Sequence, residues 1–73
     1  MITEEYRLFR LTAKPRVTRQ GRWSVAVEIQ KIGEPREPST FFADDGISYI
    51  LEEEAAKECL NLGRNLINRG QIS

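Results

Sequence analysis

Residues 22–32 read RWSVAVEIQKI, and this stretch decides the fold. Apolar and polar side chains alternate along it, with the apolar set at Trp23, Val25, Val27 and Ile29. An alternation of period two is typical of a strand that buries one face. The stretch therefore predicts a strand over 22–32 whose apolar side chains face the core.

A second strand is predicted before it, over residues 4–18. One parity carries most of its apolar side chains: Phe9, Leu11, Ala13 and Val17. Pro15 has no N–H to donate to a ladder, so we expect the strand to lie at a sheet edge or to bulge there. Residues 19–22 predict the turn between the two strands, with Gly21 supplying the positive φ.

A third, short strand is predicted over residues 39–43. It follows a loop that holds two prolines and a glycine, and it carries Phe41 and Phe42. The Asp44-Asp45-Gly46 sequence is typical of a turn. Two interpretations stay open for residues 47–51, namely a short fourth strand or a bridging segment.

From residue 51 to residue 69 the apolar period changes to 3.6, which predicts one helix. Its first turn is acidic and Gly70 is a natural stop. Gly63 in the middle of the helix indicates a close approach of the helix to the sheet, under a bulky side chain such as Trp23 or Phe41. The predicted fold is α+β, a three-stranded antiparallel sheet with room for a short fourth strand, packed against one C-terminal helix.

The chain has 73 residues, which suits one small domain over 1–73. It contains no histidine and one cysteine, Cys59. Serine or cysteine nucleophiles paired with histidine, and most zinc sites, are therefore excluded. Asp44 and Asp45 are explained by a polar turn, and the acidic cluster at 52–54 by the helix dipole. We expect a non-enzymatic domain with no cofactor and no metal.

The cellular location is predicted from two features that the sequence lacks. There is no signal peptide, and no apolar run approaches the length of a membrane span. A single cysteine allows no internal disulfide. These features predict a cytoplasmic domain with no membrane partner.

Charge is balanced overall, at eleven basic and eleven acidic side chains, but unevenly distributed. Residues 1–22 hold six basic side chains against two acidic ones. If the apolar parity of residues 4–18 faces the helix, Arg10, Lys14 and Arg16 face outward, and Arg19 and Arg22 lie at the hairpin tip. The candidate nucleic-acid-binding residues are Arg10, Lys14, Arg16, Arg19 and Arg22. Ordinary solubilising charge is the competing interpretation.

Tyr6 and Leu8 also fall on the outward parity of residues 4–18. Two exposed apolar neighbours would suit a protein partner or a homodimer seam, and the other open interpretation is that a loop or residues 47–51 fold over them. The alternative function is therefore a protein–protein interaction or homodimerisation module that uses Tyr6 and Leu8 or an exposed strand edge.

Short motifs spread over the chain carry a family resemblance. They are Tyr6-Arg7 with Arg10, Gly21-Arg22-Trp23, Glu28-Ile29, Thr40-Phe41 and Glu53-Glu54-Ala55-Ala56. In these motifs and in the order of its elements the chain resembles the three-strand-plus-helix DNA-binding domains of plant ethylene-response factors and of integrase amino termini. The resemblance implies DNA contact through the exposed sheet face, by arginines at the positions of Arg7, Arg10 and Arg22.

Overall fold

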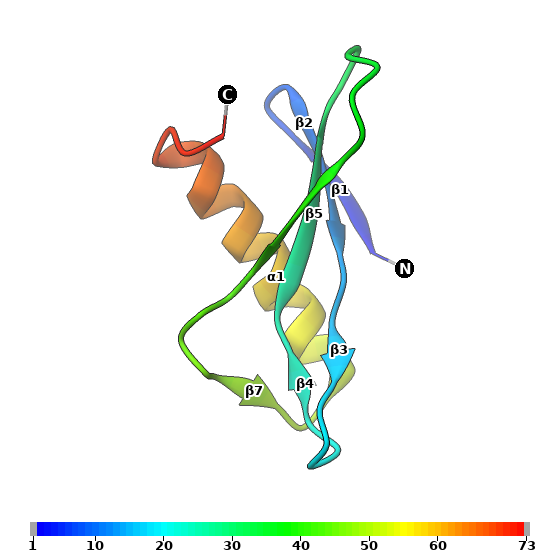
Figure 1. The fold of residues 1–73 in the computed structure, drawn as a ribbon, viewed down its shortest axis with the longest axis vertical. Coiled ribbons are helices and arrows are strands. Elements are labelled where there is room, and N and C mark those ends of the chain that lie inside the picture. Colours follow the sequence, from blue (N-terminus) through cyan, green and yellow to red (C-terminus); the bar gives the residue numbers. More distant parts are fainter. Residues whose placement is uncertain (1, 73) are drawn as a thin grey trace.

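The computed structural model describes residues 2–72 as two small antiparallel sheets and one helix (Figure 1). The strands are β1 (Thr3–Tyr6), β2 (Phe9–Ala13), β3 (Arg16–Val17), β4 (Trp23–Ser24), β5 (Ala26–Lys31), β6 (Ser39–Phe42) and β7 (Ser48–Tyr49), and the helix is α1 (Glu52–Asn68). One sheet has the order β1-β2-β5-β6 and the other the order β3-β4-β7. The predicted α+β class, with antiparallel strands packed on a C-terminal helix, is confirmed.

The two sheets are joined end to end by a common register. β2 and β5 pair from Phe9↔Lys31 to Ala13↔Val27, and β3 and β4 continue that register at Arg16↔Ser24. Only Pro15 and the residue opposite it interrupt the ladder. Pro15 lacks the N–H that the ladder needs and lies just beyond the end of β1, so it occupies an edge position, as predicted. The loop at 19–21 closes the hairpin, and Gly21 there has a φ of +75°.

The prediction of one strand over residues 4–18 is wrong at its amino-terminal end. The chain turns back at Arg7 and Leu8, so that β1 pairs with β2 from Thr3↔Thr12 to Tyr6↔Phe9. Directly paired residues face the same side of a sheet. Tyr6 therefore faces the helix together with Phe9, and not outward with Leu8.

The third predicted strand is present as β6, and the open question of residues 47–51 is settled by β7. β6 pairs with β5, whereas β7 pairs with β4, at Trp23↔Tyr49 and Ser24↔Ser48. Residues 44–47 form an excursion between the two pairings. Its turn is closed by Asp45, whose Oδ1 accepts a hydrogen bond of 3.0 Å from the N–H of Ile47.

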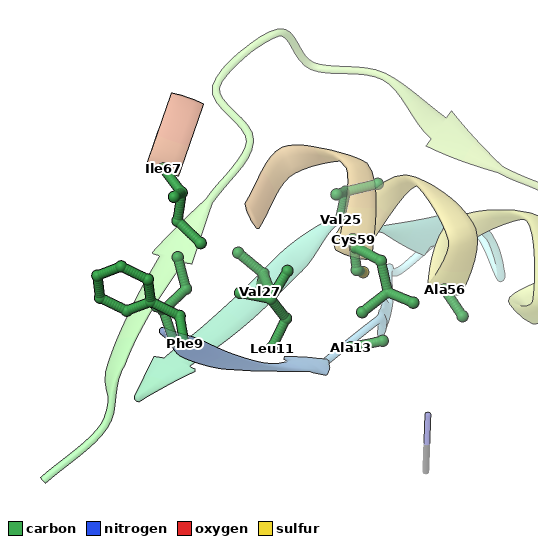
Figure 2. Close-up of a cluster of buried hydrophobic side chains, with 10 residues drawn as sticks. Phe9, Leu11, Ala13, Val25, Val27, Ala56, Cys59 and Ile67 are labelled. Carbon is green, nitrogen blue, oxygen red and sulfur yellow. The ribbon is translucent and has the colours of Figure 1, made fainter. Parts of the chain in front are cut away.

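The core lies between the sheet and one face of α1 (Figure 2). Leu11, Val27 and Cys59 are its largest fully buried side chains. The close approach expected at Gly63 is present, but the side chains over it belong to Leu11 and Val27, and not to Trp23 or Phe41. A Cβ on Gly63 would lie 3.1 Å from atoms of both. No helix within residues 2–72 has the length and apolarity that a membrane crossing requires.

The β3–β4 hairpin departs from the predicted core. Val17 is 62 % exposed, although it shares the parity of Leu11. Its cross-strand partner Trp23 is only partly buried. The hairpin projects past the amino-terminal end of α1, so the helix does not cover its tip (Figure 1). Apolar side chains are therefore less buried toward the hairpin tip, although apolar and polar residues still alternate there.

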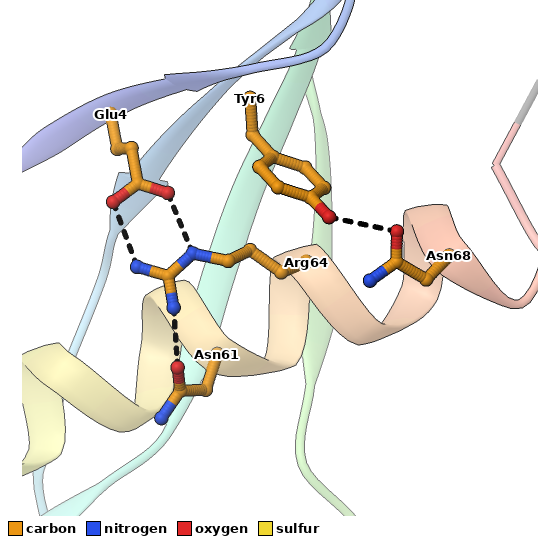
Figure 3. Close-up of polar contacts among 5 residues, drawn as sticks. All are labelled: Glu4, Tyr6, Asn61, Arg64 and Asn68. Atoms are coloured by element: carbon orange, nitrogen blue, oxygen red, sulfur yellow. Dashed lines mark hydrogen bonds and ion pairs between the residues drawn. The ribbon is translucent and has the colours of Figure 1, made fainter.

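Polar contacts tie β1 to the helix (Figure 3). Arg64 donates from Nε and Nη2 to the two carboxylate oxygens of Glu4, both at 2.7 Å. The hydroxyl of Tyr6 donates to Oδ1 of Asn68 at 2.9 Å. The edge strand is thus held over α1 by the side chains of Glu4 and Tyr6, which face the helix.

Candidate functional site

The sheet face opposite the helix gathers most of the predicted basic side chains. Because the register runs unbroken from β2 into β3, residues of even number along residues 10–16 lie on that face. We call it the outer face. It carries Arg10, Lys14, Arg16 and, from the residue just before β4, Arg22. Arg19 lies in the exposed hairpin loop at one end of it.

Two of these side chains have partners within the domain. The Nη2 atom of Arg10 lies 3.5 Å from Oε1 of Glu5, its cross-strand neighbour. The guanidinium of Arg22 donates from Nε to Oγ of Ser48 and from Nη2 to the carbonyl oxygen of Ser48, both at 2.8 Å. Arg10 is therefore partly neutralised, and Arg22 holds β7 against the hairpin.

Of the remaining basic side chains, Arg16 contacts Phe42 and Lys14 lies in the same cross-strand row as Phe42. Lys14, which follows β2, lies in one row with Ala26 of β5 and Phe42 of β6. The N–H of Lys14 donates to the carbonyl oxygen of Ala26, and Ala26 pairs with Phe42. Phe42 is 58 % exposed. The guanidinium carbon of Arg16 lies 5.2 Å from the centre of its ring. We call Lys14, Arg16 and Phe42 the cation–aromatic cluster.

Sequence reasoning missed Phe42 as a surface residue. The signal was present, because Phe41 and Phe42 are adjacent in a predicted strand and adjacent strand residues face opposite sides. Phe41 pairs with Val27 and packs on the core, so its neighbour must point outward. An aromatic side chain on the outer face followed from the predicted strand.

The outer face also carries acidic side chains. Glu28 lies between Thr12 and Thr40 in the next row, and Glu5 lies opposite Arg10. Positive charge is therefore concentrated at the hairpin end of the face, around the cation–aromatic cluster and Arg19, and does not extend over the whole sheet.

The surface expected from Tyr6 and Leu8 does not form. Tyr6 bonds to Asn68 on the helix side, whereas Leu8 is 67 % exposed at the β1–β2 turn. The guanidinium of Arg7 lies 5.6 Å from the Tyr6 ring centre. Arg7 is the main cause that lowers the pKa of the Tyr6 hydroxyl, followed by the hydrogen bond to Asn68. Arg7 lies in the β1–β2 turn, and Arg10 and Arg22 lie on the outer face.

A groove of about 460 Å³ opens on the other side of β6, between that strand, the 44–47 excursion and the carboxy-terminal half of α1. Its apolar walls come from Phe41, Tyr49, Leu62 and Leu66. Burial raises the pKa of the Tyr49 hydroxyl, and the negative charges of Glu58, Asp45 and Glu54 raise it further. Among residues 2–72, no three acidic, cysteine or histidine side chains gather in a way that could hold a metal ion.

Comparisons with protein-family models, with curated proteins and with solved structures found no match to this chain.

Proposed function

We propose that this domain binds single-stranded nucleic acid through the hairpin end of its outer face. The observation that carries the proposal is the cation–aromatic cluster, in which Arg16 lies over an exposed Phe42 ring and Lys14 lies in the same cross-strand row as Phe42. The resemblance to sheet-face DNA-binding domains points to the same face.

The chemistry of the cluster suits an unpaired base next to a phosphate. An exposed aromatic ring offers a stacking platform that every base can use, because every base has a π face. Arg16 and Lys14 supply the charges that phosphate oxygens need, and Arg19 extends them along the hairpin. A paired duplex hides its base faces, so stacking on Phe42 favours single strands.

The balanced charge of the chain limits the expected affinity. Three or so phosphate contacts predict a salt slope of about −2 for a single strand. We therefore expect micromolar binding at low salt that weakens strongly on going to physiological ionic strength.

Fluorescence anisotropy with labelled single-stranded DNA, single-stranded RNA and duplex DNA tests the proposal. At low salt the wild-type domain should bind the single strands more tightly than the duplex. Phe42→Ala removes the stacking platform from an exposed site and should weaken binding about tenfold. Arg16→Glu should weaken binding by a similar factor and reduce the salt slope.

Lys57→Glu is the matched control, because it makes the same charge change on an exposed helical residue away from the outer face. It should leave binding within about twofold of wild type. No binding of any strand at low salt with micromolar protein would refute the proposal. Equal losses from Lys57→Glu and Arg16→Glu would show nonspecific charge attraction in place of a site.

A further inference from the structure

The groove beside β6 borders strand backbone with no neighbouring strand. Within residues 2–72 β6 pairs with β5 alone. The N–H of Ala43 donates to the carbonyl oxygen of Val25, which fixes the alternation of the ladder. Phe41 and Ser39 therefore direct their backbone groups toward β5, and Thr40 and Phe42 direct theirs away from it. Two donors and two acceptors are left at the groove for an added strand.

The groove is charged with opposite sign at its two ends. Asp44, Asp45 and Glu58 line the end near β7, and Arg69 lines the end beyond Leu66. From Glu58 to Arg69 the helix rises about 17 Å, the length of about five extended residues.

The direction of β6 determines which end of an added strand would lie at the acidic end of the groove. Ser39 shares a hollow with Ile72, so β6 begins near the carboxy-terminal end of α1 and ends near Glu58. A strand added antiparallel to β6 would begin at the acidic end and finish at Arg69. Its first, third and fifth side chains would face the groove, opposite Ala43, Phe41 and Ser39.

We propose that this groove binds an extended peptide segment as a fifth strand, antiparallel to β6. The segment carries a basic side chain first, an apolar one third and an acidic one fifth. The basic group lies by Asp45 and Glu58, the apolar group packs on Phe41, Leu62 and Leu66, and the acidic group meets Arg69. Backbone groups of the second and fourth residues pair with Phe42 and Thr40. This site shares only Phe42 with the cation–aromatic cluster, because the peptide pairs with the Phe42 backbone whereas Arg16 lies over its ring.

The probe is the peptide acetyl-Lys-Thr-Leu-Thr-Glu-amide, titrated into ¹⁵N-labelled protein and followed by amide chemical shifts. We expect saturable shifts that centre on Thr40, Phe42 and Leu66. A matched peptide with proline in place of both threonines lacks the two N–H donors and should bind at least fivefold more weakly. The peptide acetyl-Glu-Thr-Leu-Thr-Lys-amide reverses the charges and should bind about three- to tenfold more weakly.

A charge-swapped protein provides the sharper test. Glu58→Lys, at a partly buried helical position, is combined with Arg69→Glu, at the exposed C-cap of α1. Because Asp44 and Asp45 remain, both ends of the groove are then negative and the charge difference between them is removed. This variant should lose the preference and bind the two peptides with affinities within about twofold of each other. Its circular dichroism and thermal unfolding, compared with those of wild type, verify that it folds.

Three results would overturn the proposal. The first is the absence of shifts at Thr40 and Phe42 at millimolar peptide. The second is an unchanged peptide preference in the folded charge-swapped protein. The third is a set of shifts at β6 that depends on protein concentration without peptide, together with a dimer in sedimentation, because a second copy would then occupy the edge. Oligonucleotide binding by the charge-swapped protein is expected to persist, which separates this test from that of the outer face.

Discussion

Arg64 on α1 and Glu4 on β1 form a two-point ion pair across 60 residues of sequence, with both N–O distances at 2.7 Å. Asn61 accepts a further hydrogen bond from the same guanidinium. The pair joins the edge strand β1 to the helix (Figure 3). The ion pair therefore holds β1 against the helix. β1 is the strand whose pairing with β2 the sequence pattern did not predict.

The first prediction concerns the strength of this pair. Glu4→Gln and Arg64→Met should each destabilise the domain, and the double variant should lose less than the two single losses combined. Two-point geometry favours the pair, but both side chains are about one-third exposed, so we expect a coupling free energy of about 0.5–1 kcal/mol. Urea unfolding of the four proteins measures it. A coupling near zero would show that β1 is held by backbone pairing alone.

The second prediction is the pH dependence of the same contact. The hydrogen bonds from Arg64 hold the pKa of Glu4 below its ordinary value. Because the folded pKa is lower than the unfolded one, the stabilisation is fully present above the unfolded pKa, about 4.3, and is lost as the pH falls through the folded pKa. The stability difference between wild type and Glu4→Gln should be constant from pH 7 to about pH 5 and shrink below that. A difference that persists at pH 2 would assign it to packing.

The third prediction concerns Gly63, where the helix meets the sheet. Alanine favours a helix by about 1 kcal/mol over glycine. Its Cβ would nevertheless lie 3.1 Å from atoms of Leu11 and Val27, two fully buried side chains that would have to shift within the packed core. Overpacking costs about 1–3 kcal/mol, so we expect Gly63→Ala to destabilise by about 1 kcal/mol. Thermal unfolding checks this.

The control for that substitution is Asn65→Ala, at an exposed position of the same helix. It should stabilise slightly, by a few tenths of a kcal/mol, because only propensity changes there. A gain in stability from Gly63→Ala similar to that from Asn65→Ala would show that the helix can move away from Leu11 and Val27.

The sequence predicted the parts of the fold that rest on periodicity. The alternation at Val25, Val27 and Ile29 and the helical period through Cys59 each mark one buried face, and all four side chains are buried. The turn at Gly21 was predictable because its positive φ favours glycine. These signals are local, so a single chain reveals them.

The errors arose where structure departs from local signals. The β1–β2 turn has Arg7 at a φ of +55°, a conformation that a sequence pattern does not suggest for arginine. Without a glycine or asparagine to mark it, residues 4–18 looked like one strand, and Tyr6 was placed on the wrong face. The alternation predicts a buried Val17, but it does not show how far the helix extends over the sheet, and the helix does not reach Val17. The basic side chains were placed from parity, but the partners of Arg10 and Arg22 required the fold.

The fourth prediction concerns Cys59. The thiol is buried, burial raises its pKa, and its Sγ lies 3.4 Å from the N–H of Ala26. Reaction with a thiol reagent needs a thiolate and access, so it should require opening of the domain. Labelling of the native protein should be at least about 100-fold slower than labelling in denaturant. Gln71→Cys in a Cys59→Ala background places the thiol on the surface and should label at the full rate.

The fifth prediction tests the strain at the unrecognised turn. Arginine at a positive φ destabilises the folded state by about 1 kcal/mol, and glycine removes this strain. The exposed contact of Arg7 with the Tyr6 ring, which glycine would lose, stabilises the domain by about 0.5 kcal/mol or less. Arg7→Gly should therefore stabilise the domain by a few tenths to 1 kcal/mol in urea unfolding. Leu8→Gly is the matched control, because Leu8 has a negative φ and glycine there only adds freedom to the unfolded chain. It should destabilise by about 0.5–1 kcal/mol. A loss of stability in both variants would mean that the contact of the Arg7 side chain with Tyr6 stabilises the turn by more than the positive φ of Arg7 destabilises it.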